Sequence, residues 1–143
     1  MRVLGCDLGS KTLGLAMSDL SGFLASPLLT IRFESDDYYS ALDQLEPLLK
    51  EHQIDTIVLG LPRHMNGSLG ESAQRSMYFK EEIEAMCSIP VILWDERLST
   101  VAANKAMLMA EMKASKRKTS IDQMAAVYIL QGYLDQLRLL KKE

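Results

Sequence analysis

The amino-acid sequence predicts an α/β fold built on a five-stranded mixed sheet with helices on both faces. Two apolar runs of strand length near the amino terminus are separated only by Gly9-Ser10-Lys11-Thr12, which is typical of an antiparallel hairpin. Two later apolar runs, residues 54–61 and 89–94, each follow a helical pattern, as parallel strands buried on both faces do. With 143 residues and 48% hydrophobic composition the chain can bury one substantial core, so we expect residues 1–143 to form a single domain.

The first third of the chain predicts an antiparallel meander followed by a helix. Residues 3–8 and 13–17 form the hairpin, a turn signal follows at residues 19–22, and residues 23–33 are apolar enough for a third strand. Pro27 then requires an edge position or a bend, because proline donates no ladder hydrogen bond. The segment Ser35-Asp36-Asp37 starts a helix, which Pro47 is expected to kink or restart.

The remaining elements alternate between strands and helices. Residues 62–70 form a loop, because their proline, Asn-Gly and glycine residues cannot continue regular structure. A mixed helix follows to about Met86, before the last strand. A helix capped by Ser99 or Thr100, a polar loop over residues 113–120 and a final helix over residues 121–140 complete the chain.

Asp7 is the first residue that this fold leaves unexplained. A charge within an apolar strand is costly unless it is paired, hydrated or bound to a metal ion. Asp7 could accept hydrogen bonds from the backbone of the following turn, as aspartate often does, or it could be a functional carboxylate.

Further acidic residues lie in comparable places. Asp95-Glu96 follows the last strand, where acids also interact favourably with the dipole of a following helix. Asp122 is in the first turn of the final helix, in line with Ala126 and Ile129 on its apolar side, although a first-turn aspartate can also be a capping group. An acid within a strand, an acid at a strand end and an acid on the inner side of a helix, all in one small domain, are consistent with one shared functional site.

The distribution of charge indicates that a polyanionic partner would be bound by a local cluster of basic residues rather than by the whole surface. The formal net charge is −3, which argues against coating of nucleic acid by bulk electrostatics. Bases nevertheless gather at Lys113, Lys116, Arg117 and Lys118, which could be a flexible flap on nucleic acid or only a solvated connection. Loop 62–70 could likewise be a substrate loop or a plain connection, since α/β sheets bind ligands at the carboxyl ends of their strands.

The sequence shows no signal for export or for a membrane. It begins with a strand almost from Met1, and no apolar run approaches the roughly 18 residues of a membrane span. We therefore expect a soluble, cytoplasmic protein without a membrane partner. The two cysteines, Cys6 and Cys87, and the two histidines, His52 and His64, cannot supply a zinc site.

Carboxylates from three distant segments suit a hard divalent cation. Mg²⁺ or Mn²⁺ is held by one or a few carboxylates with water and phosphate oxygens, and two such ions about 3.5–4 Å apart can promote phosphodiester hydrolysis. Asp7, Asp122 and either Asp95 or Glu96 would form such a site if the last helix packs across the first strand.

Four motifs, in order along the chain, resemble the YqgF/RuvX family. They are Gly5–Lys11 with Gly14-Leu15-Ala16, Gly60-Leu61-Pro62 with Gly67–Gly70, Asp95–Thr100, and Asp122–Ala126. The resemblance spans nearly the whole chain and implies an RNase H-like fold related to Holliday-junction resolvases. It also implies a nuclease of ribosome biogenesis that processes the 5′ end of pre-16S ribosomal RNA, with a DNA junction as the alternative substrate.

The resemblance assigns roles to particular residues. The family's acidic positions fall on Asp7, Glu96 and Asp122, which we expect to be both the catalytic residues and the ligands of Mg²⁺ or Mn²⁺. The expected substrate-binding residues are Lys11 and Arg97, which lie within these motifs, together with Lys116, Arg117 and Lys118 of the basic cluster described above.

The chain also departs from related patterns in three places. Thr12 stands where members often have a basic residue, which could weaken phosphate contacts, and Cys6 replaces a larger aliphatic, which should affect only packing. Gly60-Leu61-Pro62 lacks the acid that RNase H enzymes carry at the end of the fourth strand, so the second acid must come from the neighbouring strand end.

Two other functions share parts of this pattern. The opening Asp-Leu-Gly-Ser-Lys-Thr also resembles the phosphate hairpin of actin-like ATPases and sugar kinases, which clamp a nucleotide between two domains. A non-catalytic module with vestigial acids, bound to RNA or to a ribosomal particle, is the other possibility. We expect a monomer or a homodimer, and junction resolution would require a symmetric pair of active sites.

Overall fold

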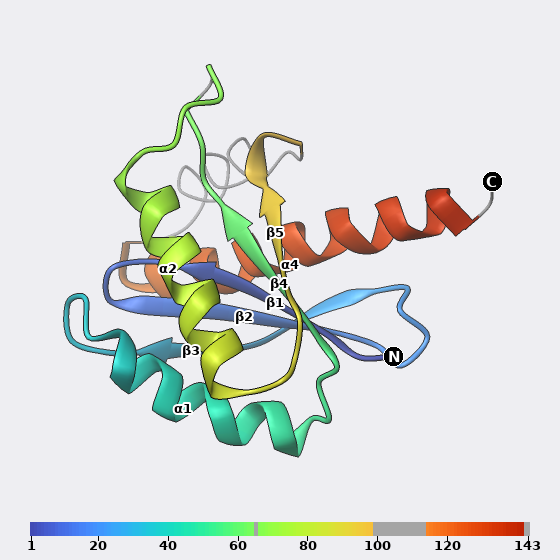
Figure 1. Ribbon diagram of the computed structural model, residues 1–143, viewed down its shortest axis with the longest axis horizontal. Coiled ribbons are helices and arrows are strands. Elements are labelled where there is room, and N and C mark those ends of the chain that lie inside the picture. The colour runs from blue at the N-terminus through green and yellow to red at the C-terminus, as the bar shows by residue number, and fades with distance from the viewer. Residues whose placement is uncertain (65, 99–113, 142–143) are drawn as a thin grey trace.

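The computed structural model contains five strands in one sheet, flanked by helices (Figure 1). It describes the backbone of residues 1–64, 66–98 and 114–141, and the side chains of residues 1–64, 66–97 and 123–140. In chain order the described elements are β1 (Val3–Leu8), β2 (Thr12–Ser18), β3 (Ala25–Arg32), α1 (Tyr38–Glu51), β4 (Thr56–Leu61), α2 (Glu71–Met86), β5 (Val91–Asp95), the 3₁₀ turn η1 (Glu96–Leu98) and α4 (Ala114–Lys141).

The central strand of the sheet is β1, in the order β3-β2-β1-β4-β5. It pairs antiparallel with β2 and parallel with β4, while β2 pairs antiparallel with β3 and β4 parallel with β5. The predicted meander and the two predicted parallel strands are therefore confirmed. The mixed sheet places the carboxyl ends of β1, β4 and β5 at one edge.

Pro27 lies where the sequence required it. Its strand, β3, is at the edge of the sheet, so the missing N–H interrupts no second ladder. The pairing with β2 also shifts register there, from Leu15 opposite Leu29 to Ala16 opposite Pro27. The sequence predicted either an edge position or a bend for this proline, and the edge position is confirmed.

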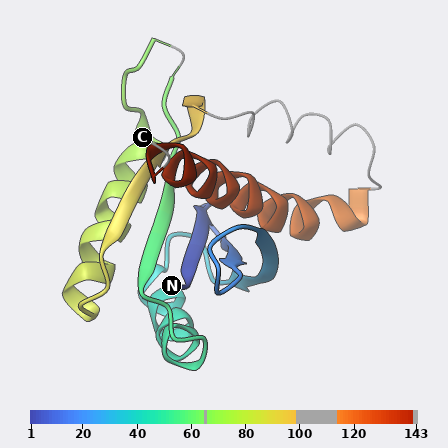
Figure 2. The same ribbon diagram turned by 90° about the vertical axis from the view of Figure 1, so that its right-hand side faces the viewer.

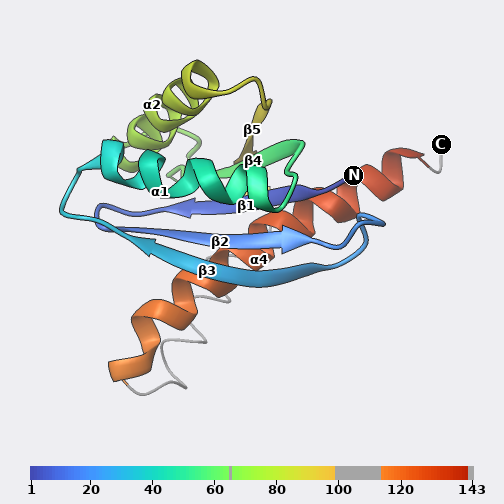
Figure 3. The same ribbon diagram turned by 90° about the horizontal axis from the view of Figure 1, so that it is seen from below.

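The two faces of the sheet are covered by different helices. Figures 2 and 3 show α1 and α2 on one face and α4 crossing the other. The core beneath α1 and α2 includes Cys6, Leu59 and Phe79, whereas the core beneath α4 includes Val3, Trp94 and Ile129. Because side chains alternate along a strand, successive residues of β1 enter different cores.

Helix α1 begins where predicted, and it runs through Pro47 as one continuous helix rather than restarting there. The Asp37 carboxylate caps the helix by accepting a hydrogen bond from the Ser40 N–H at 3.3 Å. The helix continues through Pro47 to Glu51 because its apolar face is buried on both sides of the proline, at Leu45 and Leu49. Burying each leucine contributes about 1.5–3 kcal/mol, which offsets the hydrogen bond that proline cannot donate.

The final helix is longer than the sequence predicted. It begins at Ala114, so residues 114–120, which were expected to form a loop, are helical. The prediction was wrong because it relied on apolar periodicity, whereas lysine, arginine and alanine favour helices even without an apolar face. The helix expected to start at Ser99 or Thr100 lies outside the described residues.

No helix in the described part of the chain is both long and apolar enough to span a bilayer.

Candidate metal site at the carboxyl edge of the sheet

Three parallel strands end at the same edge of the sheet, and each delivers residues of the predicted motifs. Asp7 lies near the end of β1, Gly60 near the end of β4, and Asp95 ends β5. The carboxyl edge of an α/β sheet is where ligands commonly bind. Residues far apart in the sequence are thereby brought to one place.

Asp7 lies on the face of the sheet that α4 covers. Val3 packs in the core beneath α4 and Cys6 packs in the opposite core, so by alternation Gly5 and Asp7 share the face of Val3. Helix α4 crosses β1 at Gly5, where a Cβ atom would lie 2.7 Å from Leu130 Cβ and 2.9 Å from the Ala126 carbonyl oxygen. The half-buried Asp7 is two residues beyond this crossing point, towards the carboxyl edge.

Glu96 reaches the same face from the end of β5. A Cβ atom on Gly60 would lie 3.5 Å from Glu96 Cδ and 2.5 Å from Ile129 Cδ1 of α4, so the Glu96 carboxyl group lies over β4 on the α4 face. The register pairs Cys6 with Leu59, which sets the next residues, Asp7 and Gly60, on neighbouring strands about 4.8 Å apart. Asp7 on β1 and the Glu96 carboxyl group over the neighbouring β4 therefore lie on the same face of the sheet, at its carboxyl edge.

This pair suits a hard divalent cation. Mg²⁺ is usually bound through one or two carboxylates, with water and substrate phosphate completing the shell. Both side chains are only half-buried, which leaves room for those ligands. Among the described side chains, no three histidine, cysteine or acidic residues form a metal-binding group.

Asp122, the third predicted acid, belongs to the first half of α4. Its backbone lies one helical turn before Ala126, whose carbonyl oxygen faces Gly5. Its side chain is outside the described residues, so its approach to Asp7 stays a prediction.

Asp95 differs from Glu96 in both direction and partners. Trp94 packs beneath α4, so Asp95 points to the opposite face, where its carboxylate is 15% exposed. It accepts hydrogen bonds from the Arg97 N–H at 2.9 Å, from Arg97 Nη2 at 2.8 Å and from Arg63 Nη1 at 3.4 Å. Hydrogen bonds from the Arg97 side chain and N–H, and then from Arg63, lower the pKa of Asp95 to about 2.

The predicted substrate-binding residues occupy three separate places. Lys11 is exposed on the turn between β1 and β2, at the carboxyl end of β1. The Arg97 guanidinium binds Asp95 and lies against Gly67, where a Cβ atom would be 3.2 Å from Nη1. The backbone of residues 116–118 is in the first turns of α4, which extend beyond the sheet (Figure 3).

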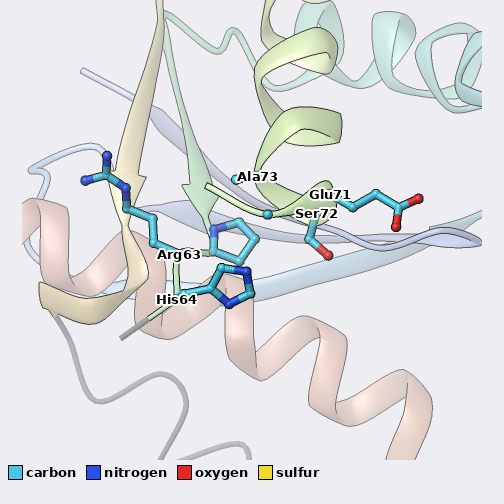
Figure 4. Close-up of a pocket in the computed structure, with 7 residues that line it drawn as sticks. Arg63, His64, Glu71, Ser72 and Ala73 are labelled. Atoms are coloured by element: carbon cyan, nitrogen blue, oxygen red, sulfur yellow. The ribbon is translucent and has the colours of Figure 1, made fainter. Parts of the chain in front are cut away.

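Residues 62–64 and 70, together with the start of α2, line an open cavity of about 330 Å³. Its lining residues are Pro62, Arg63, His64, Gly70, Glu71, Ser72 and Ala73. Figure 4 shows Arg63 turned towards β5 and His64 turned towards the start of α2. The loop is therefore tied to the end of β5 through Arg63 and Asp95.

Two residues of this site, Gly60 and Arg63, have no role predicted from the sequence. Gly60 matters because its missing side chain lets Ile129 of α4 pack closely against β4, beside Glu96. The sequence signal for this role was a glycine within an otherwise apolar strand. Arg63 lies in a loop and belongs to no helical or strand pattern. Only its place just after a strand, where α/β sheets bind ligands, could have suggested a role at the site.

Comparison with solved structures defines the class to which this fold belongs. RuvC of Thermus thermophilus in complex with a Holliday junction superposes with a TM-score of 0.68, at 13% identity, covering 97% of this chain and 96% of that chain. The fowlpox virus resolvase in complex with junction DNA gives a TM-score of 0.53, at 13% identity, over 96% of this chain and 99% of that one. The fold is thus the RNase H-like fold of the RuvC-type resolvases.

Sequence comparison identifies the family. The RuvX family model, described as "Holliday junction resolvase", matches residues 1–136, and the chain belongs to this family. A relative from Oceanobacillus iheyensis is 50% identical over 136 residues, which cover 95% of this chain and 99% of the relative. A relative from Staphylococcus aureus N315 is 47% identical over 137 residues, covering 95% and 96%. Both relatives bear the name "Putative pre-16S rRNA nuclease".

Proposed function

We propose that the chain is a metal-dependent nuclease that hydrolyses phosphodiester bonds in structured nucleic acid, with Asp7, Glu96 and Asp122 as catalytic residues. The observation that carries this proposal is the placement of Asp7 and Glu96 on one face at the carboxyl edge of the sheet. Two carboxylates that reach one face of the sheet edge from distant segments are the kind of ligand pair through which Mg²⁺ is usually bound.

The proposed substrate is the 5′ end of pre-16S ribosomal RNA. Relatives covering nearly all of this chain bear the name of a nuclease for that precursor. Action on precursor ribosomal RNA would place the protein in the cytoplasm, where that RNA is made. A DNA junction is the second candidate, since the family description and the RuvC-type fold both support it.

Each proposed residue has a distinct part in the reaction. Asp7 and Glu96 would hold Mg²⁺ or Mn²⁺ through their carboxylate oxygens, and Asp122 would complete the set from α4. When bound, the cation supplies Lewis-acid stabilisation of the phosphate and an activated water. Lys11 would contact the phosphate beside Asp7, while Lys116, Arg117 and Lys118 would bind the backbone of the polymer.

The test is cleavage of three substrates by the purified protein, with and without Mg²⁺ or Mn²⁺. They are precursor ribosomal RNA, single-stranded RNA and a four-way DNA junction. Metal-dependent cleavage of the precursor at its 5′ end is the expected result. Preferential cleavage of the junction by a dimer would favour the second candidate.

Binding measurements separate the remaining functions. Mn²⁺ binding that Asp7→Asn abolishes supports the nuclease, whereas binding of ATP would support the kinase-like alternative. A protein that binds RNA but neither metal nor ATP would be a non-catalytic module.

A further inference from the structure

Asp95 organises the turn that carries Glu96. It is the last residue of β5, and η1 begins at the next residue, Glu96. The Arg97 N–H donates to Asp95 Oδ1 at 2.9 Å, which closes the turn over Glu96. The backbone on both sides of Glu96 is therefore held by one carboxylate.

The Arg97 and Arg63 side chains hold that carboxylate in turn. Arg97 Nε lies 3.2 Å from each Asp95 oxygen and Nη2 lies 2.8 Å from Oδ2. Such charge-assisted, bidentate hydrogen bonds are stronger than neutral ones and fix the relative orientation of the two side chains. Arg63 adds a contact from the end of β4. We call Asp95, Arg97 and Arg63 the Asp95 clamp.

We propose that Asp95 is a positioning residue for Glu96, acting through the Asp95 clamp rather than as a metal ligand. The inference rests on the proposed function, in which Glu96 holds the cation. Glutamate has several rotatable bonds, and a 3₁₀ turn of three residues offers little rigidity of its own. The clamp fixes the backbone from which Glu96 reaches over Gly60 on the opposite face.

Residues that hold a metal ligand in place affect metal affinity and activity even though they do not touch the metal. Removing such an outer partner typically costs 10–100-fold in metal affinity or activity. Asp95→Ala and Arg97→Gln should therefore each weaken Mn²⁺ binding by about tenfold or more, measured by calorimetry on the full chain. The Asp95→Ala/Arg97→Gln double variant should lose no more than the larger single loss, because both changes break the same clamp.

The same variants separate positioning from two simpler effects. The double variant has the net charge of the wild type, so a purely Coulombic effect of Asp95 would restore binding in it. If Asp95 were itself a ligand, Arg97→Gln would release its carboxylate and strengthen binding. Either result would overturn the inference.

A matched variant and a structural measurement control for folding. Asp55→Asn removes a carboxylate that accepts a backbone hydrogen bond at 3.0 Å, from Arg2, at the other end of β4. It should leave Mn²⁺ binding unchanged. In the metal-free protein, Asp95→Ala should speed hydrogen exchange at the Arg97 amide while keeping the melting temperature close to that of the wild type. If Asp95→Ala does not fold, Asp95→Asn keeps the size of the side chain and should show an intermediate loss.

Failure of the inference and failure of the proposed function are distinguishable. If the wild type binds Mn²⁺, Glu96→Gln abolishes binding and all clamp variants bind normally, only the positioning role is overturned. If the wild type and Glu96→Gln both fail to bind Mn²⁺, the proposed metal site falls and the positioning role falls with it.

Discussion

The two neighbouring carboxylates, Asp7 and Glu96, can be tested one side chain at a time. We expect Asp7→Asn and Glu96→Gln each to reduce cleavage by at least about a hundredfold, since charge stabilisation by a bound cation is worth several kcal/mol in the transition state. Asp122→Asn should have the same effect. Single-turnover cleavage, with every variant at the Mn²⁺ concentration that saturates the wild type, measures the loss.

Thermal melting without metal provides the control for this prediction. Both side chains are only half-buried, and the amide variants keep their size, so the variants should melt close to the wild type. An Asp7→Asn variant that melts much lower would instead identify Asp7 as a structural residue.

Gly60 is a second residue whose role can be measured. Alanine there would place its Cβ atom 2.5 Å from Ile129 Cδ1, so Gly60→Ala should destabilise the fold by about 1–3 kcal/mol in urea unfolding. Ile129→Val deletes that same methyl group. The double variant Gly60→Ala/Ile129→Val should recover most of the loss, and additive losses would show that the clash lies elsewhere.

The first turns of α4 form the element to which we assign nucleic-acid backbone binding. Changing Lys116, Arg117 and Lys118 to alanine should weaken substrate binding and reduce its salt dependence by up to about three phosphate contacts. Because alanine is the best helix former, the helix itself should persist. A binding titration against salt concentration, with circular dichroism, tests both statements.

A charge-matched triple variant distinguishes local contacts from net charge. Lys50, Arg75 and Lys80 lie on α1 and α2, across the sheet from α4. Changing these three to alanine removes equal charge and should leave substrate binding nearly unchanged. Equal weakening by both triple variants would show that residues 116–118 make no specific contact.

The connection between β2 and β3 depends on one acidic side chain. Asp19 accepts hydrogen bonds from the Ser21 hydroxyl at 2.8 Å and from the Phe23 N–H at 2.7 Å, and these lower its pKa below 3.8. A lowered pKa in the folded state means that Asp19 stabilises the turn above pH 3.8 and loses this effect as the pH falls. Hydrogen exchange at the Phe23 amide should therefore accelerate as the pH drops from about 5 to about 2, relative to intrinsic rates. Asp19→Asn should abolish that pH dependence.

Local sequence patterns predicted most elements because each pattern has one physical cause. The Gly-Ser-Lys-Thr turn between apolar runs could only join an antiparallel pair, and the run at residues 54–61 had no polar face to expose. Residues 114–120 were mispredicted because they extend past the sheet, where a helix needs no apolar side (Figure 3). The resemblance assigned Asp7 and Glu96 to one site, but the residues alone did not decide between Asp95 and Glu96. That choice required knowing that Glu96 turns back over Gly60 while Asp95 is held by the Asp95 clamp. The clamp joins Arg63 to Asp95, which are 32 residues apart in the sequence, and no sequence spacing predicts such a contact.

At the scale of the whole molecule, Cys6 reports on global unfolding. It is fully buried on the central strand, and burial, with a smaller contribution from the Asp7 charge, raises the pKa of its thiol. Cys87 is only half-buried at the end of α2. A thiol reagent should therefore modify Cys87 in the native protein and Cys6 only at the rate of global opening. Cys87→Ser should remove the fast phase, and a fast phase that persists would contradict the buried position of Cys6.

The strand order also determines when during folding the acidic site can form. β1, β2 and β3 pair with neighbours in sequence, so the meander can form through local contacts alone. Asp7 meets Glu96 only after β4 has paired with β1 and β5 with β4, and these parallel pairings close long stretches of chain and are intrinsically slow. A nascent chain that ends before β5 can thus hold a folded meander yet lacks the second carboxylate. Cation binding should consequently appear late in refolding, after the meander becomes protected from hydrogen exchange.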